Sequence, residues 1–161
     1  MDDASGERGW GLPLAAHCRC GQVAMTVSAP PILTTACHCR GCQRMTGGAY
    51  SLSVAIPVNG FQVSGAEPVR GGLKEGPLRH MFCPHCLSWI YTDLTEMGFM
   101  NMRAPMLDDP SWVLPFVETQ TAERLPGVQT GATISFERFP DMDIWPAIAK
   151  RFASEGPRPV S

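Results

Sequence analysis

The alternation of apolar and polar residues along the chain is typical of short β-strands. Side chains that alternate with a period of two predict strands over residues 22–27, 49–56, 61–64, 88–93, 98–103 and 112–119. Asn59-Gly60, between the second and third of these segments, is a strong turn signal. Many short strands separated by turn signals favour a mainly β domain.

Helical periodicity is clear in one place, near the C-terminus. Ile144, Ile148 and Phe152 recur every four residues and predict a short helix over residues 143–153. Pro146 suits the first turn of such a helix, where its missing N–H has no intrahelical partner to lose.

The length of 161 residues indicates one domain. Residues 1–13, with several glycines and few apolar residues, are expected to form a flexible leader, and residues 156–161 a frayed tail. The single domain between them covers residues 14–155. Inside it, residues 43–48 indicate a short helical turn or loop, and residues 120–135 show no clear pattern.

Charge and targeting signals narrow the function classes. A formal net charge of -2 and a pI near 6.0 give no sign of a nucleic-acid surface, so no nucleic-acid partner is expected. Residues 1–10 contain no apolar signal-peptide segment, and no apolar run approaches the length of a membrane span. The sequence therefore predicts a cytoplasmic protein without a membrane partner.

Seven cysteines dominate the candidate chemistry. An odd number excludes a complete disulfide framework, and clustered cysteines in a cytosolic chain are more often metal ligands. They form three clusters: Cys18 and Cys20; Cys37, Cys39 and Cys42; Cys83 and Cys86. The simplest partition is four plus three, in which the two pairs close a tetrahedral all-sulfur site that selects zinc or iron. Such a site would clamp the start of the domain to its middle.

The remaining trio is expected to hold a second ion. In an extended segment Cys37 and Cys39 share one face and His38 points to the other, while Gly41 permits the turn that brings Cys42 round. Three protein ligands plus an open position are typical of catalytic zinc. An ion of this kind can polarise a carbonyl or bind a substrate thiolate.

Other interpretations of these residues stay open at this stage. A histidine could complete the trio as a closed structural site, with His17, His80 and His85 as candidates and His38 on the wrong face. An iron–sulfur cluster is disfavoured, because a four-three split matches no common cluster spacing.

Arg44 could be an anion-binding residue or a solvated surface charge. The large aromatic residues of the second half are interpreted as core rather than pocket: Trp89, Tyr91, Phe99 and Trp112.

The cysteine motifs resemble those of the glutathione-dependent formaldehyde-activating enzymes and their relatives, which include centromere protein V. Cys37-His38-Cys39-Arg40-Gly41-Cys42-Gln43-Arg44, followed by Thr46-Gly47-Gly48-Ala49, is similar to the family's cysteine-rich signature. Phe82-Cys83-Pro84-His85-Cys86, followed by Ser88-Trp89-Ile90-Tyr91, resembles its second signature. The strong match runs from about residue 17 to residue 92. Leu87 stands where the family often has glycine.

The resemblance implies a fold and a set of roles. The fold would be the Mss4-like β-tent, a zinc-binding β domain, here with a short C-terminal helix. Two zinc ions per chain would be bound, the structural ion by Cys18, Cys20, Cys83 and Cys86 and the catalytic ion by Cys37, Cys39 and Cys42. The activity of the family joins glutathione and formaldehyde through a carbon–sulfur bond, giving S-hydroxymethylglutathione.

The leading hypothesis is therefore a zinc-dependent carbon–sulfur lyase-like enzyme acting on the adduct of a small thiol, such as glutathione, and a small aldehyde. His38 and His85 are candidates for a general acid. Two alternatives from other classes remain, a non-catalytic Mss4-like binding module and a sensor whose zinc-bound thiolates respond to oxidation.

Overall fold

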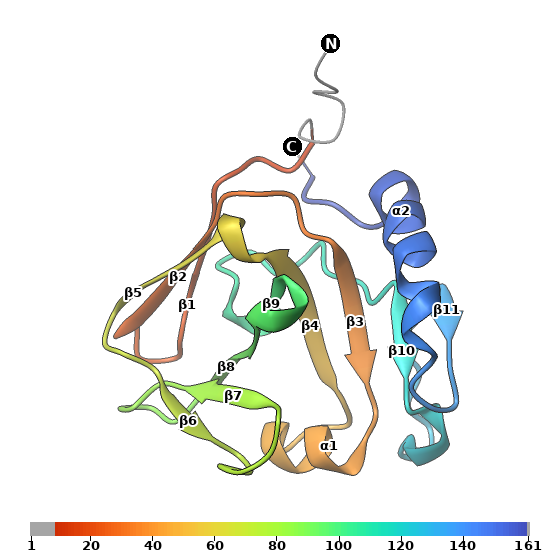
Figure 1. Ribbon diagram of the computed structural model, residues 1–161, viewed down its shortest axis with the longest axis horizontal. Helices are drawn as coiled ribbons and strands as arrows, with labels where there is room; N and C mark the ends of the chain where they lie inside the picture. Colours follow the sequence, from red (N-terminus) through yellow and green to blue (C-terminus); the bar gives the residue numbers. More distant parts are fainter. Residues whose placement is uncertain (1–8, 161) are drawn as a thin grey trace.

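The computed structural model describes residues 9–160, and the fold is mainly β with two short helices. The expected mainly β domain with a short C-terminal helix is confirmed. Within the described residues, eleven strands form a three-stranded and an eight-stranded sheet. Figure 1 shows the small sheet at the upper left, while the large sheet runs from β6 and β7 at the lower left to β10 and β11 at the right. No helix among residues 9–160 is long and apolar enough to cross a membrane.

The small sheet is antiparallel, with strand order β1-β2-β5. Its strands are β1 (Leu14–His17), β2 (Val23–Val27) and β5 (Phe61–Gly65). The alternation that predicts β2 is the burial pattern itself, because Val23, Met25 and Val27 are buried and the residues between them are half-buried. One face of this sheet therefore closes the core.

The large sheet has the order β11-β10-β3-β4-β9-β8-β7-β6. The strands are β3 (Leu33–Cys37), β4 (Ser51–Pro57), β6 (Val69–Gly71), β7 (Arg79–Phe82), β8 (Trp89–Leu94), β9 (Phe99–Arg103), β10 (Val117–Thr119) and β11 (Ile134–Ser135). Neighbouring strands are antiparallel except at β10, which runs parallel to both β3 and β11. This parallel pairing places a late segment of the chain against the strand that leads into the central cysteines.

The predicted strands correspond to β2, β4, β5, β8 and β9. The prediction over residues 112–119 is only partly right, because β10 begins at Val117 and the preceding buried residues lie in a loop. The alternation does not predict β1, β3, β6, β7 or β11. Strands β1, β6, β7 and β11 have only two to four residues, and β3 does not alternate, since Leu33 and Thr34 are both buried.

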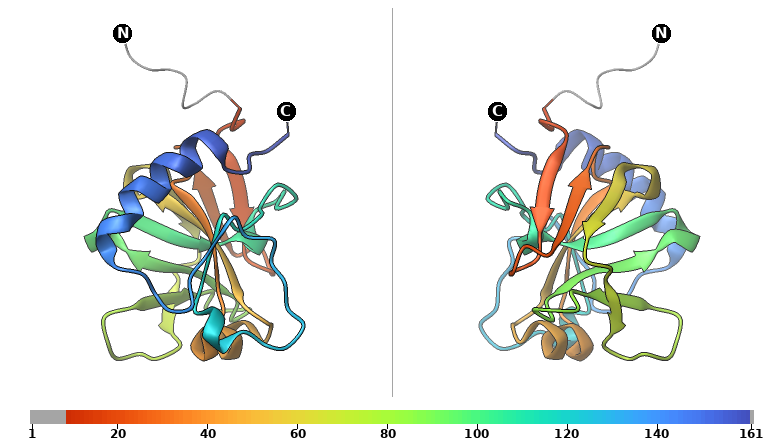
Figure 2. Two further views of the ribbon diagram at one scale, coloured as in Figure 1. Left: turned by 90° about the vertical axis from the view of Figure 1, so that its right-hand side faces the viewer. Right: turned by 90° about the vertical axis from the view of Figure 1, so that its left-hand side faces the viewer.

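Helix α2 (Trp145–Glu155) confirms the predicted C-terminal helix. Pro146 lies in its first turn, and Ile148 and Phe152 are buried in the core. The helix lies beside β10 and β11 at the edge of the large sheet, and the left view of Figure 2 shows it crossing in front of the strands. The other helix, α1 (Arg40–Thr46), connects β3 to β4 and begins three residues earlier than the expected helical turn.

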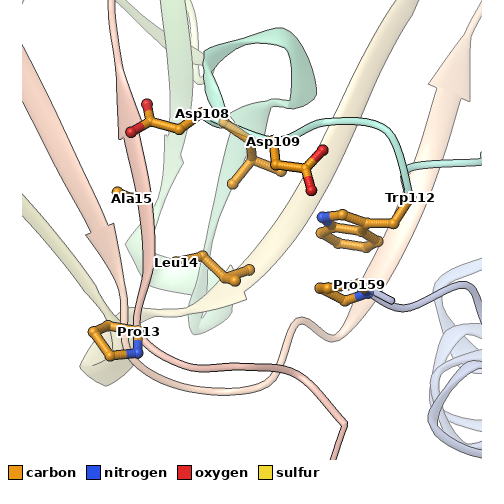
Figure 3. Close-up of a pocket in the computed structure, with 8 residues that line it drawn as sticks. Pro13, Leu14, Ala15, Asp108, Asp109, Trp112 and Pro159 are labelled. Carbon is orange, nitrogen blue, oxygen red and sulfur yellow. The ribbon is translucent and has the colours of Figure 1, made fainter. Parts of the chain in front are cut away.

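Both ends of the described chain pack against the domain. Trp10, expected in a flexible leader, is buried in the core, with its ring centroid 5.4 Å from that of Trp112 and 6.2 Å from that of Phe152. In the expected tail, Pro159 lies beside Trp112 and Leu14 at a small cavity of about 160 Å³ (Figure 3). The other residues of the expected leader, 1–8, and the last residue of the expected tail, 161, lie outside the described residues.

Candidate metal centre

The two outer cysteine pairs meet at one corner of the molecule. Cys18 and Cys20 follow β1, and Cys83 and Cys86 follow β7, so the chain returns to the same point after more than sixty residues. Their four Sγ atoms lie within 4.8 Å of one another, with 3.5 Å between Cys18 and Cys20 and 3.7 Å between Cys20 and Cys83. Sulfurs bound tetrahedrally at about 2.3 Å from zinc would be about 3.8 Å apart, so the four residues fit such an ion.

Two similar turns present these sulfurs. The N–H of Val23 donates to Cys18 Sγ at 3.4 Å, and the N–H of Cys86 donates to Cys83 Sγ at 3.5 Å. Burial raises the pKa of Cys86, but hydrogen bonds with Ser88 outweigh it and lower that pKa to about 5. The second turn ends at Leu87, whose φ of 58° is left-handed. Glycine adopts that conformation without strain, whereas leucine rarely does.

The central trio is assembled where a strand passes into a helix. Cys37 ends β3, Cys39 is the N-cap of α1, and Cys42 lies in the first turn. The Sγ of Cys39 accepts from the N–H of Cys42 at 3.3 Å, and the three Sγ atoms lie within 4.8 Å of one another. The hydrogen bond with Cys42 lowers the pKa of Cys37 to about 5 and raises that of Cys42. A group that reaches the thiolate state this readily suits a metal ligand.

Gly41 does not have the role expected from the sequence. It lies inside α1 without a positive φ, so the capping of the helix by Cys39, and not a glycine turn, brings Cys42 to the other sulfurs. We expect Gly41→Ala to keep the fold and metal content, and to leave the melting temperature unchanged or slightly higher. Alanine is the better helix former by up to about 1 kcal/mol, and its Cβ would meet Cys39 Sγ at an ordinary 3.8 Å.

Thermal melting and elemental analysis of the Gly41→Ala protein check this expectation. Gly47→Ala is the matched control, because Gly47 is the left-handed residue that ends the same helix and should lose stability on substitution. Loss of metal from Gly41→Ala alone would restore the glycine-turn interpretation.

His38 is fully buried on the side of the segment away from the three sulfurs, as the extended pattern predicts. Its Nε2 atom bonds Glu118 Oε2 of β10 at 2.8 Å. The same carboxylate accepts from Arg124 Nη2 at 2.6 Å, Thr130 Oγ1 at 2.7 Å and Ser135 Oγ at 2.6 Å. We name these five residues the Glu118 network. It anchors the backbone between Cys37 and Cys39 to the segment after β10.

Burial raises the pKa of Glu118, but its hydrogen bonds and the Arg124 charge outweigh burial and lower that pKa to about 2. Gln43 adds a second anchor, because its Nε2 donates to the carbonyl oxygens of His38 at 2.6 Å and Glu123 at 2.9 Å. Sequence reasoning missed Glu118 and Gln43. Neither has a local signal for this role, because the bonds that join the two segments, His38 to Glu118 and Gln43 to Glu123, each span eighty residues.

No histidine completes the trio. Among the described residues, no imidazole or carboxylate joins the three sulfurs within 4.8 Å. His17 pairs with Asp108 at 2.5 Å, His80 Nδ1 bonds Thr92 Oγ1 at 2.9 Å, and His85 is exposed. Residues 9–160 therefore supply three ligands here, which disfavours the closed-site alternative.

A cavity of about 560 Å³ is lined by Cys86 of the outer group and by the end of helix α1, the helix that carries Cys42, but by none of the trio cysteines. Its lining residues are Arg19, Met45, Thr46, Tyr50, Leu52, Cys86, Leu87, Ser88, Trp89, Arg103, Pro105 and Met106. Trp89 is buried, as expected of a core residue, but its ring also lines this cavity and packs on the buried guanidinium of Arg103, with Arg103 Cζ 4.0 Å from its ring centroid. Arg44 is exposed and does not line it, as the surface-charge interpretation expects.

The model of the glutathione-dependent formaldehyde-activating enzyme family matches residues 13–123, a range that contains all seven cysteines. The chain belongs to this family, and the resemblance drawn from its motifs is confirmed. Among proteins of curated function, none matches the chain. The crystal structure of a Rhodobacter sphaeroides protein is similar at 14% identity and a TM-score of 0.45, covering 76% of this chain and 99% of that one. The family match ends before Arg124, Thr130 and Ser135 of the Glu118 network.

Proposed function

We propose that this protein is a zinc-dependent carbon–sulfur lyase-like enzyme that makes or breaks the adduct of a small thiol and a small aldehyde, with glutathione and formaldehyde as the first pair. The observation that carries the proposal is a three-sulfur group for which residues 9–160 supply no fourth ligand. Family membership points to the same chemistry.

Each cysteine group has a proposed role. Cys18, Cys20, Cys83 and Cys86 would hold a structural zinc ion, and Cys37, Cys39 and Cys42 a catalytic one, giving two ions per chain. When bound to the trio, zinc would supply a Lewis acid with room for the sulfur or oxygen of the substrate. The protein's own contribution is to hold three sulfurs in place from a strand end and a helix N-cap.

The two histidines suggested as general acids do not fit that role. His38 is fully buried with Nε2 bonded to Glu118, so it supports the trio's backbone. His85 is exposed and is not among the residues lining the cavity. The proton of the thiol would therefore pass to water, and the enzyme would act chiefly through positioning.

The test is the rate of hemithioacetal exchange. We expect the protein to accelerate formation and breakdown of S-hydroxymethylglutathione. Because this reaction also reaches equilibrium without an enzyme, the yield is uninformative, and the exchange rates with and without protein are compared by NMR exchange spectroscopy. Serine substitution of Cys37, Cys39 or Cys42 should abolish the acceleration while the circular dichroism spectrum stays folded. Elemental analysis should give two zinc ions in the wild type.

Absence of acceleration across a panel of thiols and aldehydes, with both ions present, would contradict the proposal. That result would favour the alternative of a metal-stabilised binding module. Reversible loss of zinc from the trio on mild oxidation, without turnover, would favour the sensor alternative.

A further inference from the structure

Arg103 lies on the same side of the large sheet as the trio. In the β3–β4 pair Cys37 is opposite Ser51, and in the β4–β9 pair Ser53 is opposite Arg103. Residues opposite each other in antiparallel strands share a face, as do residues two apart along one strand. The Cys37 and Arg103 side chains therefore emerge on one face, separated only by β4.

The guanidinium of Arg103 is buried without a carboxylate. The residue is 5% exposed, and its Nη2 donates to the carbonyl oxygen of Asn101 at 3.0 Å. Its Nε has no hydrogen-bond partner, and no acidic side chain of residues 9–160 forms an ion pair with it. Burial lowers the pKa of Arg103 to about 10, and the negative charges of the Cys42 and Cys37 thiolates partly oppose that lowering, so the group stays charged at neutral pH. A buried guanidinium that has nearby thiolates but no carboxylate to accept its hydrogen bonds leaves donors unsatisfied, which is costly.

Arg124 is a second largely buried arginine, and unlike Arg103 it has a carboxylate partner. Its Nη2 is paired with Glu118 Oε1 at 2.6 Å. The protein thus supplies a carboxylate to one covered arginine and leaves the other facing a cavity. A ligand carboxylate at Arg103 would supply the missing partner.

The cavity lining supports an anionic ligand. It includes two arginines, Arg19 and Arg103, and no Asp or Glu. Trp89 contributes a second buried donor without a partner, its Nε1–H. The lining also includes three residues with hydroxyl groups, which can donate hydrogen bonds to an anion: Thr46, Tyr50 and Ser88. At about 560 Å³ the cavity is within the range of about 300–1,000 Å³ usual for small-molecule sites.

We infer that this cavity is the binding site for the thiol substrate, and that Arg103, stacked on Trp89, binds a carboxylate of that thiol. The inference rests on the proposed function for its choice of ligand. It selects anionic thiols such as glutathione over neutral thiols of similar size. Arg103 then acts as a specificity-determining residue, holding the substrate so that its sulfur lies toward the trio.

The test uses binding, so that it does not depend on turnover. S-methylglutathione has both carboxylates but no free thiol, and its dimethyl ester lacks both negative charges. Isothermal titration of the zinc-loaded wild type should give binding of S-methylglutathione and a loss of roughly 10- to 100-fold for the ester, the effect of one charged hydrogen-bonded pair. Equal binding of the two compounds, or no binding of either, would overturn the inference.

Variants of Arg103 test whether this residue causes the difference in affinity between the acid and its ester. Arg103→Gln should weaken S-methylglutathione by the same factor and remove the difference between acid and ester, and Arg103→Lys should recover part of the affinity. Arg138→Gln makes the same charge change at an exposed position outside the cavity and should bind like the wild type. Arg103→Gln that is folded and binds S-methylglutathione like the wild type would also overturn the inference. If Arg103→Gln does not fold, the acid–ester comparison on wild type still decides.

Different results would contradict the carboxylate site and the proposed enzymatic function. Exchange that is accelerated equally for glutathione, its esters and neutral thiols would support the function and overturn the carboxylate site. Binding of S-methylglutathione through Arg103 without any acceleration would support the site and contradict the enzyme.

Discussion

Cys83→Ser is expected to leave the protein unfolded or aggregated. Cys83 is fully buried, and with Cys86 it brings the end of β7 to the end of β1, where Cys18 and Cys20 lie. If the four sulfurs hold zinc, the binding free energy is also folding free energy, with apparent values of about 10–16 kcal/mol in zinc-finger peptides. Total domain stability is typically about 5–15 kcal/mol, so loss of one ligand can remove most of it.

Circular dichroism and thermal melting of Cys83→Ser, prepared beside Cys39→Ser, measure this effect. Cys39→Ser is the matched control, because the substitution is the same but the trio lies within six consecutive residues. It therefore does not join distant segments of the chain. That variant should fold and melt cooperatively. Equal damage from both substitutions would mean that the trio is also structural.

Glu118→Ala is expected to cost about 3–5 kcal/mol of unfolding free energy. Removing one partner from a buried ionic network leaves the others without a partner, and here His38, Arg124, Thr130 and Ser135 all lose an acceptor. Because His38 lies between Cys37 and Cys39, metal content at the trio should fall as well. Urea denaturation and elemental analysis give the two quantities, and Glu137→Gln, at an exposed position, is the control.

Glu118→Gln tests the same network through pH. The pKa of Glu118 is lowered from 4.5 to about 2, so its charge stabilises the fold at all pH values above about 4.5. That contribution, about 3 kcal/mol, is lost as pH falls from about 4.5 through about 2. The stability difference between wild type and Glu118→Gln should therefore be constant near neutral pH and shrink below pH 4.5. A difference independent of pH would mean that the charge of Glu118 does not stabilise the fold.

The sequence alone determined the features that depend on neighbouring residues and on residue type. Spacings of a few residues determine the amphipathic helix α2 and the division of the seven cysteines into four and three. They also determine the alternating strands β2, β4, β5, β8 and β9. The opposed directions of His38 and the two flanking cysteines follow in the same way, because adjacent side chains in an extended segment point to opposite faces. These signals were sufficient to place the chain in its family.

Only the tertiary structure decided which distant residues support those sulfurs. Glu118 meets His38 eighty residues away because β10 pairs in parallel with β3, and a period of two does not encode which strands become neighbours. The burial of Trp10 and the burial of Arg103 without a carboxylate partner have the same origin. Whether a charged or aromatic side chain is core, surface or cavity wall depends on what packs over it, and that is fixed only when the sheets and the helix close around one core.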